Sequence, residues 1–267
     1  MKDFFNLGIL SSMPEELGSI LTLLNNVQKK DLGDLVIYKG KWTLNNTKDF
    51  EINVILAWSG WGKVSASRAT TRIICEGENS NFPIDLLIFT GVAGSASALV
   101  DQNDLVIADS VIQHDMDAEP LFRKFVIPAF SKDIIFPKKE IISWALNSFI
   151  KNQHSKDLSH IRSIQKGLIA TGDNFITDKE IIKNIKNYFP KLIAVEMEGA
   201  AFAQVALQEK INWLLIRVIS DNANNDADLD FKEFLEKYQN NSVNTIKCII
   251  NSIPNYPLLS TNNLKDS

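Results

Sequence analysis

The sequence contains little cysteine and little histidine. Its 267 residues include two cysteines, Cys75 and Cys248, both within apolar helical patterns. The three histidines, His114, His154 and His160, lack the spacing of metal ligands. This content argues against a disulfide framework and against a cysteine-based metal site. We therefore expect a protein that binds no metal.

Long apolar runs and an excess of positive charge are also missing. No run reaches the ~20 residues that span a bilayer, and the N-terminus lacks the basic and apolar regions of a secretion signal. The net charge of −4 gives no indication of a nucleic-acid partner. With 45% hydrophobic and 22% charged residues, the composition is that of a globular protein. We expect a cytoplasmic protein with neither nucleic acid nor a membrane as partner.

No internal repeat, low-complexity block or linker divides the chain. Its length suffices for one large domain or two small ones. We therefore predict a single domain over residues 1–267, in which residues 251–267 form a loose C-terminal tail.

The chain is organised around residues 193–203. This stretch begins apolar, carries Glu196 and Glu198, and continues with small residues at helical spacing. The pattern predicts a strand that ends just before a helix, with both carboxylates on one side while the chain is extended. Glu198 would lie at the helix N-terminus, where a negative charge is stabilised. Taken alone, the stretch is better explained by two solvated acids at a capped helix start.

Other predicted strands end in similar residues. Near Ser12, Ser59, Thr90 and Glu196, an apolar segment gives way to Gly, Ser, Thr or Glu. Ligand sites of α/β sheets lie at the carboxyl ends of strands. The convergence of four such ends therefore predicts a ligand site there.

The remaining pattern predicts an alternation of strands and helices. A helix should follow Pro14 through Leu24, and one long helix should cover residues 231–250. An aperiodic segment at residues 112–136 is predicted to be a long loop that serves as a lid or contact surface. The other predicted strands are residues 6–10, 35–38, 41–44, 51–58, 84–90, 105–110, 166–170 and 213–221, and the other helices are residues 65–78, 137–150 and 178–188.

Two features of the second half indicate function. Arg217 lies inside an apolar strand that Asp221 ends, and a buried arginine needs an acidic partner. Glu16, Glu196 and Glu198 are the candidates.

Phe175 and Ile176 are apolar residues within a polar turn. They either pack under the loop or present an aromatic face to a flat ligand.

With these segments placed, the sequence resembles the 5′-methylthioadenosine/S-adenosylhomocysteine nucleosidases of the nucleoside phosphorylase superfamily. Six motifs carry the resemblance: GILSSMPEE at 8–16, SGWGKV at 59–64, TGVAG at 90–94, TGDNFI at 171–176, VEME at 195–198 and RVISD at 217–221. The resemblance implies an α/β fold, a single-domain three-layer α/β/α architecture with a central mixed, partly barrel-like sheet. It also implies a homodimer without cofactors.

The resemblance implies a role for each matching residue. Glu16 would activate the attacking water, and Asp221 would deliver a proton to adenine N7. Glu198 would bind the ribose hydroxyls. The remaining expected substrate-binding residues are Glu196 of the same motif, Met197 beneath the sugar, Phe175 stacked on adenine, Ile176 at the base edge, Arg217 near the acids, and Met13 and Phe231 around the 5′ substituent.

Two positions depart from the family pattern. Val92 stands where many members have serine, so a hydrogen bond near the ribose is expected to be missing or replaced. Trp61 stands where smaller aliphatic residues are common, which reshapes the sugar side of the pocket. Both are included among the expected substrate-binding residues.

The expected activity is hydrolysis of the N-ribosidic bond of 5′-methylthioadenosine and S-adenosylhomocysteine, with 5′-deoxyadenosine as a further candidate substrate. Breaking this bond requires an acid for the leaving group and a base for water. One alternative is a purine nucleoside phosphorylase, which would need basic residues at the glycine loops. The other is a non-catalytic nucleoside-binding protein, which would not need a full set of acids and bases.

Overall fold

The structure is a computed structural model that describes residues 4–44, 50–221, 223 and 227–259. The expected loop at residues 45–49, parts of the polar segment 222–230 and residues 260–267 lie outside the described residues.

Ten strands form one mixed sheet, in the order β10-β6-β8-β9-β5-β1-β4-β3-β2, with β7 added to β6. β10 also pairs with β5, so β5, β10, β6, β8 and β9 close into a ring. The expected mixed, partly barrel-like sheet is confirmed. The strands are β1 (Phe4–Ser11), β2 (Asn25–Asp31), β3 (Val36–Trp42), β4 (Glu51–Trp58), β5 (Leu86–Ser95), β6 (Leu105–Gln113), β7 (Ile134–Ile135), β8 (Ile164–Thr171), β9 (Leu192–Glu196) and β10 (Asn212–Asp221).

The pairing of strands brings their polar ends to one place. β5 runs parallel to β1 and β10, and its residues are nearly all buried, as expected for strands covered on both faces. β9 runs antiparallel to β5, but the two pair only at their ends, where Gly94 lies opposite Val195. The ring therefore places Glu196 beside the ends of β5 and β10.

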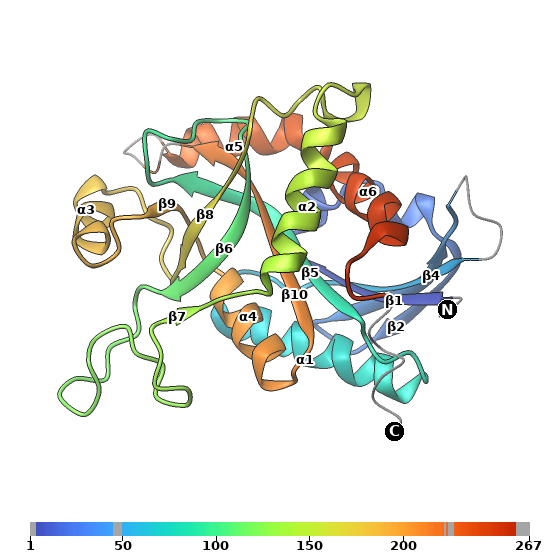
Figure 1. Ribbon diagram of the computed structural model, residues 1–267, viewed down its shortest axis with the longest axis horizontal. Helices are drawn as coiled ribbons and strands as arrows, with labels where there is room; N and C mark the ends of the chain where they lie inside the picture. Colours follow the sequence, from blue (N-terminus) through green and yellow to red (C-terminus); the bar gives the residue numbers. More distant parts are fainter. Residues whose placement is uncertain (1–3, 45–49, 222, 224–226, 260–267) are drawn as a thin grey trace.

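Helices cover both faces of the sheet (Figure 1). α1 (Lys63–Asn79) and α4 (Gly199–Gln208) pack together on one face. α2 (Lys139–Asn152) and α6 (Ser242–Ser252) pack together on the other, near α5 (Ala227–Tyr238). α3 (Lys179–Tyr188) lies at one side. This arrangement confirms the three-layer prediction.

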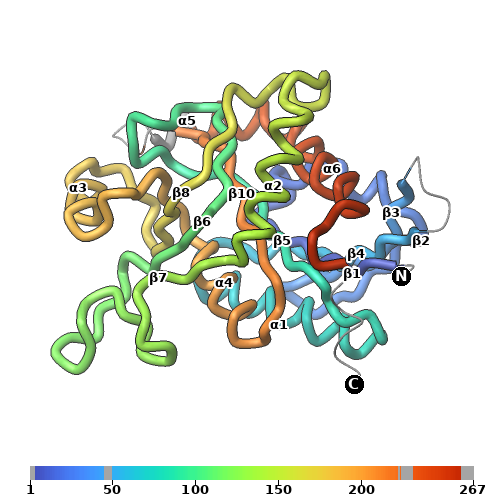
Figure 2. The backbone as a smooth tube through the Cα atoms, viewed as in Figure 1, coloured from blue at the N-terminus to red at the C-terminus, as the bar shows by residue number. Residues whose placement is uncertain are grey.

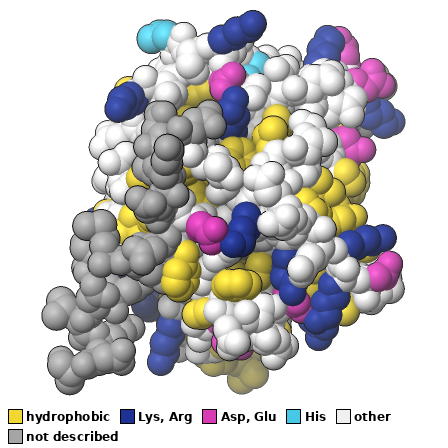
Figure 3. Space-filling model, turned by 90° about the vertical axis from the view of Figure 1, so that its right-hand side faces the viewer, with side chains coloured by type: hydrophobic (Ala, Val, Ile, Leu, Met, Phe, Trp, Pro, Cys, Tyr) yellow, Lys and Arg dark blue, Asp and Glu magenta, His cyan; other side chains and the backbone are white. Residues whose placement is uncertain are grey.

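A loop between β6 and β7 extends away from the rest of the molecule (Figure 2). It covers most of residues 112–136, where a loop was predicted, although β6 continues to Gln113. On the face shown in Figure 3, basic and acidic side chains are interspersed with small groups of hydrophobic ones. No helix in the described part of the chain is long and apolar enough to cross a membrane.

The prediction of one helix from Pro14 to Leu24 is wrong. Two short 3-10 helices occupy this stretch, η1 (Pro14–Glu16) and η2 (Ile20–Leu23). Gly18 separates them with a φ of +50°, a left-handed conformation that interrupts a helix.

Two strand predictions also need correction. The expected strands 35–38 and 41–44 are one strand, β3, which pairs antiparallel with β4. β4 itself pairs in parallel with β1. β2 was not predicted, because all its residues are exposed and lack an apolar alternation.

The C-terminal helix and tail also differ from the prediction. The expected helix over 231–250 is divided into α5 and α6 by a polar turn that begins at Gln239. The expected loose tail from residue 251 is wrong for its first part. α6 runs to Ser252, and Ile253 and Tyr256 are buried against the core.

Candidate active site

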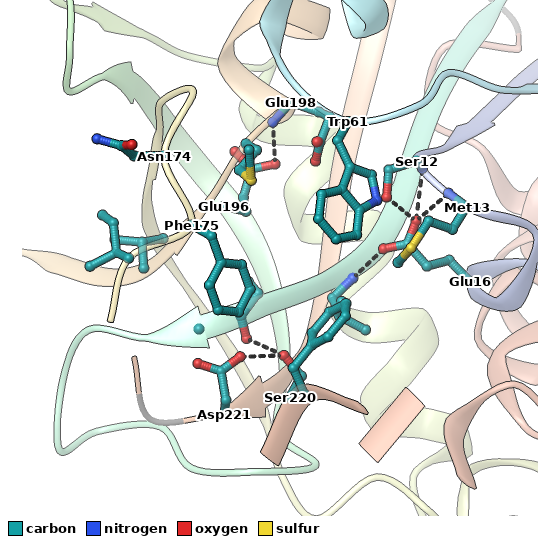
Figure 4. Close-up of a pocket in the computed structure, with 17 residues that line it drawn as sticks. Ser12, Met13, Glu16, Trp61, Asn174, Phe175, Glu196, Glu198, Ser220 and Asp221 are labelled. Atoms are coloured by element: carbon teal, nitrogen blue, oxygen red, sulfur yellow. Dashed lines mark hydrogen bonds between the residues drawn. The ribbon is translucent and has the colours of Figure 1, made fainter. Parts of the chain in front are cut away.

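A pocket that is partly open to solvent lies where the strand ends meet (Figure 4). Residues from distant parts of the sequence line it: Ser12, Met13, Glu16, Trp61, Val92, Ala93, Gly94, Asn174, Phe175, Ile176, Val195, Glu196, Met197, Glu198, Ser220, Asp221 and Phe231.

All the site residues expected from the sequence line this pocket except Arg217. Six further lining residues received no role from the sequence, namely Ser12, Ala93, Gly94, Asn174, Val195 and Ser220. All six lie within the motifs that suggested the family, so proximity in sequence was the available signal. The structure brings the expected residues together, while their chemical roles stay predictions.

Glu16 is buried at the end of η1 and is held by four hydrogen bonds. Its Oε2 accepts from the backbone N–H of Ser12 at 2.7 Å, from the Ser12 hydroxyl at 2.6 Å and from the N–H of Met13 at 3.0 Å. Its Oε1 accepts from the N–H of Val92 at 2.9 Å. Burial raises the pKa of Glu16, although Arg217 and these donors oppose the rise. Val92 thus contributes its backbone rather than a side-chain hydroxyl.

Arg217 lies behind the pocket with 1% of its surface exposed. Its guanidinium pairs with Glu196 and lies 3.5 Å from Glu198 Oε2. These contacts confirm the prediction that the buried Arg217 has an acidic partner. The backbone of Gly91 passes so close that a Cβ there would lie 2.5 Å from Arg217 Nη1 and would overlap Glu16. Glycine is therefore required at this position.

Glu196 ends β9 and is enclosed by donors. It accepts bonds from the N–H groups of Glu198 and Gly199, from the Thr171 hydroxyl and from Arg217. A carboxylate at a helix N-terminus satisfies amide groups that have no partner within the helix. Glu196 thus fixes the start of α4 and orients Arg217.

Glu198 is buried one residue before α4. Its Oε1 accepts from the N–H of Gly62 at 2.9 Å. Burial, and then the negative charge of Glu196, raise the pKa of Glu198 to about 8 against the opposing effect of Arg217. The surroundings of Glu198 thus favour its protonated form more than water does.

Asp221 ends β10 on the other side of the pocket from Glu16 (Figure 4). It is 3% exposed and accepts from the Ser220 hydroxyl at 2.7 Å and from the N–H of Ala223 at 2.8 Å. A Cβ at Gly94 would lie 3.0 Å from Asp221 Oδ1, so the bare backbone of Gly94 leaves room for this carboxyl group.

Three aromatic side chains line the outer part of the pocket. Phe231 of α5 contacts Trp61 edge-on, with ring centroids 6.2 Å apart, and Phe175 in the same manner at 5.7 Å. Trp61 is 52% exposed and Phe175 is 39% exposed. These exposed rings can cover a flat apolar ligand. Trp61 is the most exposed of the three and therefore lies at the outer edge of the pocket.

Acids dominate the charge of this pocket. No lysine, arginine or histidine is among the described residues that line it. Nor does the described part of the chain contain a group of three or more His, Cys, Asp or Glu side chains that could hold a metal ion. The chemistry available from these residues is proton transfer and hydrogen bonding.

Comparison with known proteins gives a consistent result. Residues 6–253 match the model of the phosphorylase superfamily. The 5′-methylthioadenosine/S-adenosylhomocysteine nucleosidase of Anoxybacillus flavithermus is 31% identical over 250 residues, which cover 93% of this chain and 99% of that protein.

Solved structures are similar as well. The 5′-methylthioadenosine/S-adenosylhomocysteine nucleosidase of Neisseria meningitidis, in complex with methylthio-immucillin-A, superposes with a TM-score of 0.80 and 28% identity over 92% of this chain and 99% of that chain. A futalosine hydrolase of Helicobacter pylori superposes with a TM-score of 0.77 and 30% identity over 94% and 98% of the respective chains.

The pKa of Glu198 leads to a prediction about stability. A group whose pKa is raised on folding stabilises the native state most below its unfolded pKa, near 4.5, and this contribution is lost as the pH rises to about 8. Glutamine does not titrate. We therefore expect Glu198→Gln to gain stability relative to the wild type between pH 5 and pH 8.5, measured by urea unfolding.

Glu76 provides the matched control. It is buried against Lys30 and Lys39, which lower its pKa, so its titration falls below this pH range. The effect of Glu76→Gln should be constant from pH 5 to 8.5. An equally constant difference for Glu198→Gln would contradict the raised pKa.

Proposed function

The chain belongs to the phosphorylase superfamily and, within it, to the family of the 5′-methylthioadenosine/S-adenosylhomocysteine nucleosidases, and on this premise we propose that it hydrolyses the N-ribosidic bond of both nucleosides. The products are adenine and the 5-thio-substituted ribose, which assigns the enzyme to methionine salvage and to removal of a by-product of methyl transfer. We propose 5′-deoxyadenosine as a third substrate. The observation that carries the proposal is the placement of Glu16 and Asp221 on different sides of one pocket.

Glu16 is proposed as the general base. Three donors occupy its Oε2, whereas a single backbone N–H, that of Val92, is bonded to Oε1. A carboxylate oxygen has two lone pairs, so Oε1 can also accept a proton from water. A pKa raised by burial brings Glu16 closer to neutrality, where a base is most effective.

Asp221 is proposed as the general acid for adenine. Loss of adenine leaves negative charge on the base unless a proton reaches it, and protonation of the leaving group is the task of one carboxyl in glycoside hydrolysis. Ser220 and the N–H of Ala223 fix the orientation of the Asp221 carboxyl. Phe175 would stack on the adenine ring, and Ile176 would contact the edge of the base.

Glu198 is proposed to bind the ribose hydroxyls, with Met197 beneath the sugar. In its charged form Glu198 accepts their hydrogen bonds and stabilises positive charge that develops on the sugar. Met13 and Phe231 would surround the 5′ substituent, next to Trp61.

The test is adenine release from 5′-methylthioadenosine by the purified protein. We expect turnover by the wild type, and a loss in kcat of about 10²-fold or more in Asp221→Asn, which keeps the shape but delivers no proton. Asp109→Asn is the matched control, because Asp109 accepts from the adjacent Ser110 hydroxyl in the same way but outside the pocket. Near-normal turnover by Asp221→Asn would remove Asp221 from the mechanism.

We also propose a homodimer in which the loop between β6 and β7 reaches the pocket of the partner subunit. The loop extends from the body of the molecule and carries Leu121 and Phe122, which are 85% and 37% exposed. Apolar side chains gathered on a projecting loop favour a protein contact. Sedimentation should show a dimer at assay concentrations, and a fully active monomer would refute the shared pocket.

A cytoplasmic location is proposed as well. Its support is that Cys75 and Cys248 are both free thiols, as in proteins of a reducing compartment.

A further inference from the structure

We propose that Asp173, together with Lys63 and Asp115, is a positioning residue that sets how strongly the enzyme prefers ribonucleosides over 2′-deoxyribonucleosides. It would do so by holding the start of α1 against Glu198. This inference rests on the proposed binding of the ribose hydroxyls by Glu198.

Three hydrogen bonds join these residues, hereafter the Lys63 cluster. The N–H of Lys63 donates to Asp173 Oδ1 at 2.7 Å, and the N–H of Asp173 donates to Asp115 Oδ2 at 3.0 Å. Lys63 Nζ closes the cluster with a bond to Asp115 Oδ1 at 2.5 Å. The cluster thus connects the first residue of α1 with the segments that follow β6 and β8.

The start of α1 depends on carboxylates from outside the helix. Gly62 precedes the helix and has no side chain with which to cap it. Its N–H donates to Glu198, and the next N–H, that of Lys63, donates to Asp173. The free amide groups at a helix start favour negative charge. The Gly62 amide therefore binds Glu198 of the pocket, and the adjacent Lys63 amide binds Asp173 of the Lys63 cluster.

The backbone conformation of Gly62 restricts how Gly62 and Asp173 can pack together. Gly62 has a φ of +90°, which side chains of L-residues rarely allow, and a Cβ there would lie 2.9 Å from Asp173 Oδ1. Asp173 therefore packs directly on the peptide that presents the Gly62 N–H to Glu198. A shift of Asp173 would move that peptide and reorient the carboxyl group.

The segments on the far side of the cluster are themselves fixed. The N–H of His114 donates to the carbonyl oxygen of Thr171 at 2.9 Å, and a Cβ at Gly172 would overlap the His114 ring. The residues after β6 and β8 thus form one unit. α1 is anchored to this unit through Asp173 and Asp115.

The Lys63 cluster lies outside the pocket, because none of its three residues lines it. Asp173 also adjoins Asn174, which lines the pocket, but an effect on the choice between ribose and 2′-deoxyribose would pass through Gly62 and Glu198. A merely structural role would consist of capping α1, which would contribute to the stability of the folded protein as other helix caps do. The two roles differ in one respect, since capping alone does not distinguish substrates with and without a 2′-hydroxyl.

The experiment compares kcat/KM for 5′-methylthioadenosine and its 2′-deoxy analogue in Asp173→Ala. We expect the preference for the ribonucleoside to fall by about fivefold or more, as for the loss of one well-aligned hydrogen bond. Asp173→Asn retains an oxygen that can accept from Lys63, so it should restore most of the preference. Lys63→Met keeps the backbone contact and should have a smaller effect than Asp173→Ala.

Asp178→Ala is the matched control. Asp178 caps α3 by accepting from the N–H of Glu180 at 2.8 Å, so its removal costs a helix cap without touching the Lys63 cluster. We expect it to lower the melting temperature about as much as Asp173→Ala and to leave the substrate preference unchanged.

Glu198→Gln separates the inference from its premise. Suppose that Glu198→Gln reduces the preference for the ribonucleoside but Asp173→Ala keeps the wild-type preference. The Lys63 cluster then has only a structural role, and the inference is wrong. If Glu198→Gln also leaves the preference unchanged, the assignment of Glu198 to the ribose hydroxyls fails together with the inference.

Discussion

The burial of Arg217 is the constraint on which the site depends. A guanidinium with 1% of its surface exposed must be paired, because an isolated charge in the interior is strongly destabilising. Glu196 provides the closest partner, Glu198 lies 3.5 Å away, and the charge of Glu16 also acts on Arg217. The ring of Phe89 covers the guanidinium at 4.8 Å. Glu16 and the pair Glu196 and Glu198 come from two segments far apart in sequence, so this one cation holds the ends of several elements together.

This arrangement determines which nucleophile the pocket can accept. A phosphate dianion needs cationic or amide donors, but no basic side chain is among the described residues that line the pocket. Arg217 pairs through Nη2 with Glu196 and Glu198, and it does not line the pocket. A negative charge ~4 Å from Glu16 would be disfavoured by roughly 4 kcal/mol at an effective dielectric constant of ~20. Water, which is neutral and can give a proton to Glu16, meets no such barrier.

Much of the site could be predicted from the sequence, because strand ends in an α/β fold converge by topology. The motifs around Glu16, Glu198 and Asp221 were identified, and the acidic partners of Arg217 were correctly expected. What could not be predicted depends on contacts between distant segments. The Lys63 cluster joins residues that are 52 to 110 positions apart, and no local pattern signals it. The helix expected after Pro14 fails for a local reason, a left-handed glycine whose φ no periodicity reveals.

The central claim is that the acidic pocket uses water rather than phosphate, and product analysis tests it most directly. The protein is incubated with 5′-methylthioadenosine in isotopically labelled water, with and without millimolar phosphate. The account predicts free 5-methylthioribose with the label at C1, formed at a rate that phosphate does not change. A ribose 1-phosphate product, or a rate that rises in proportion to phosphate, would contradict it and identify a phosphorylase.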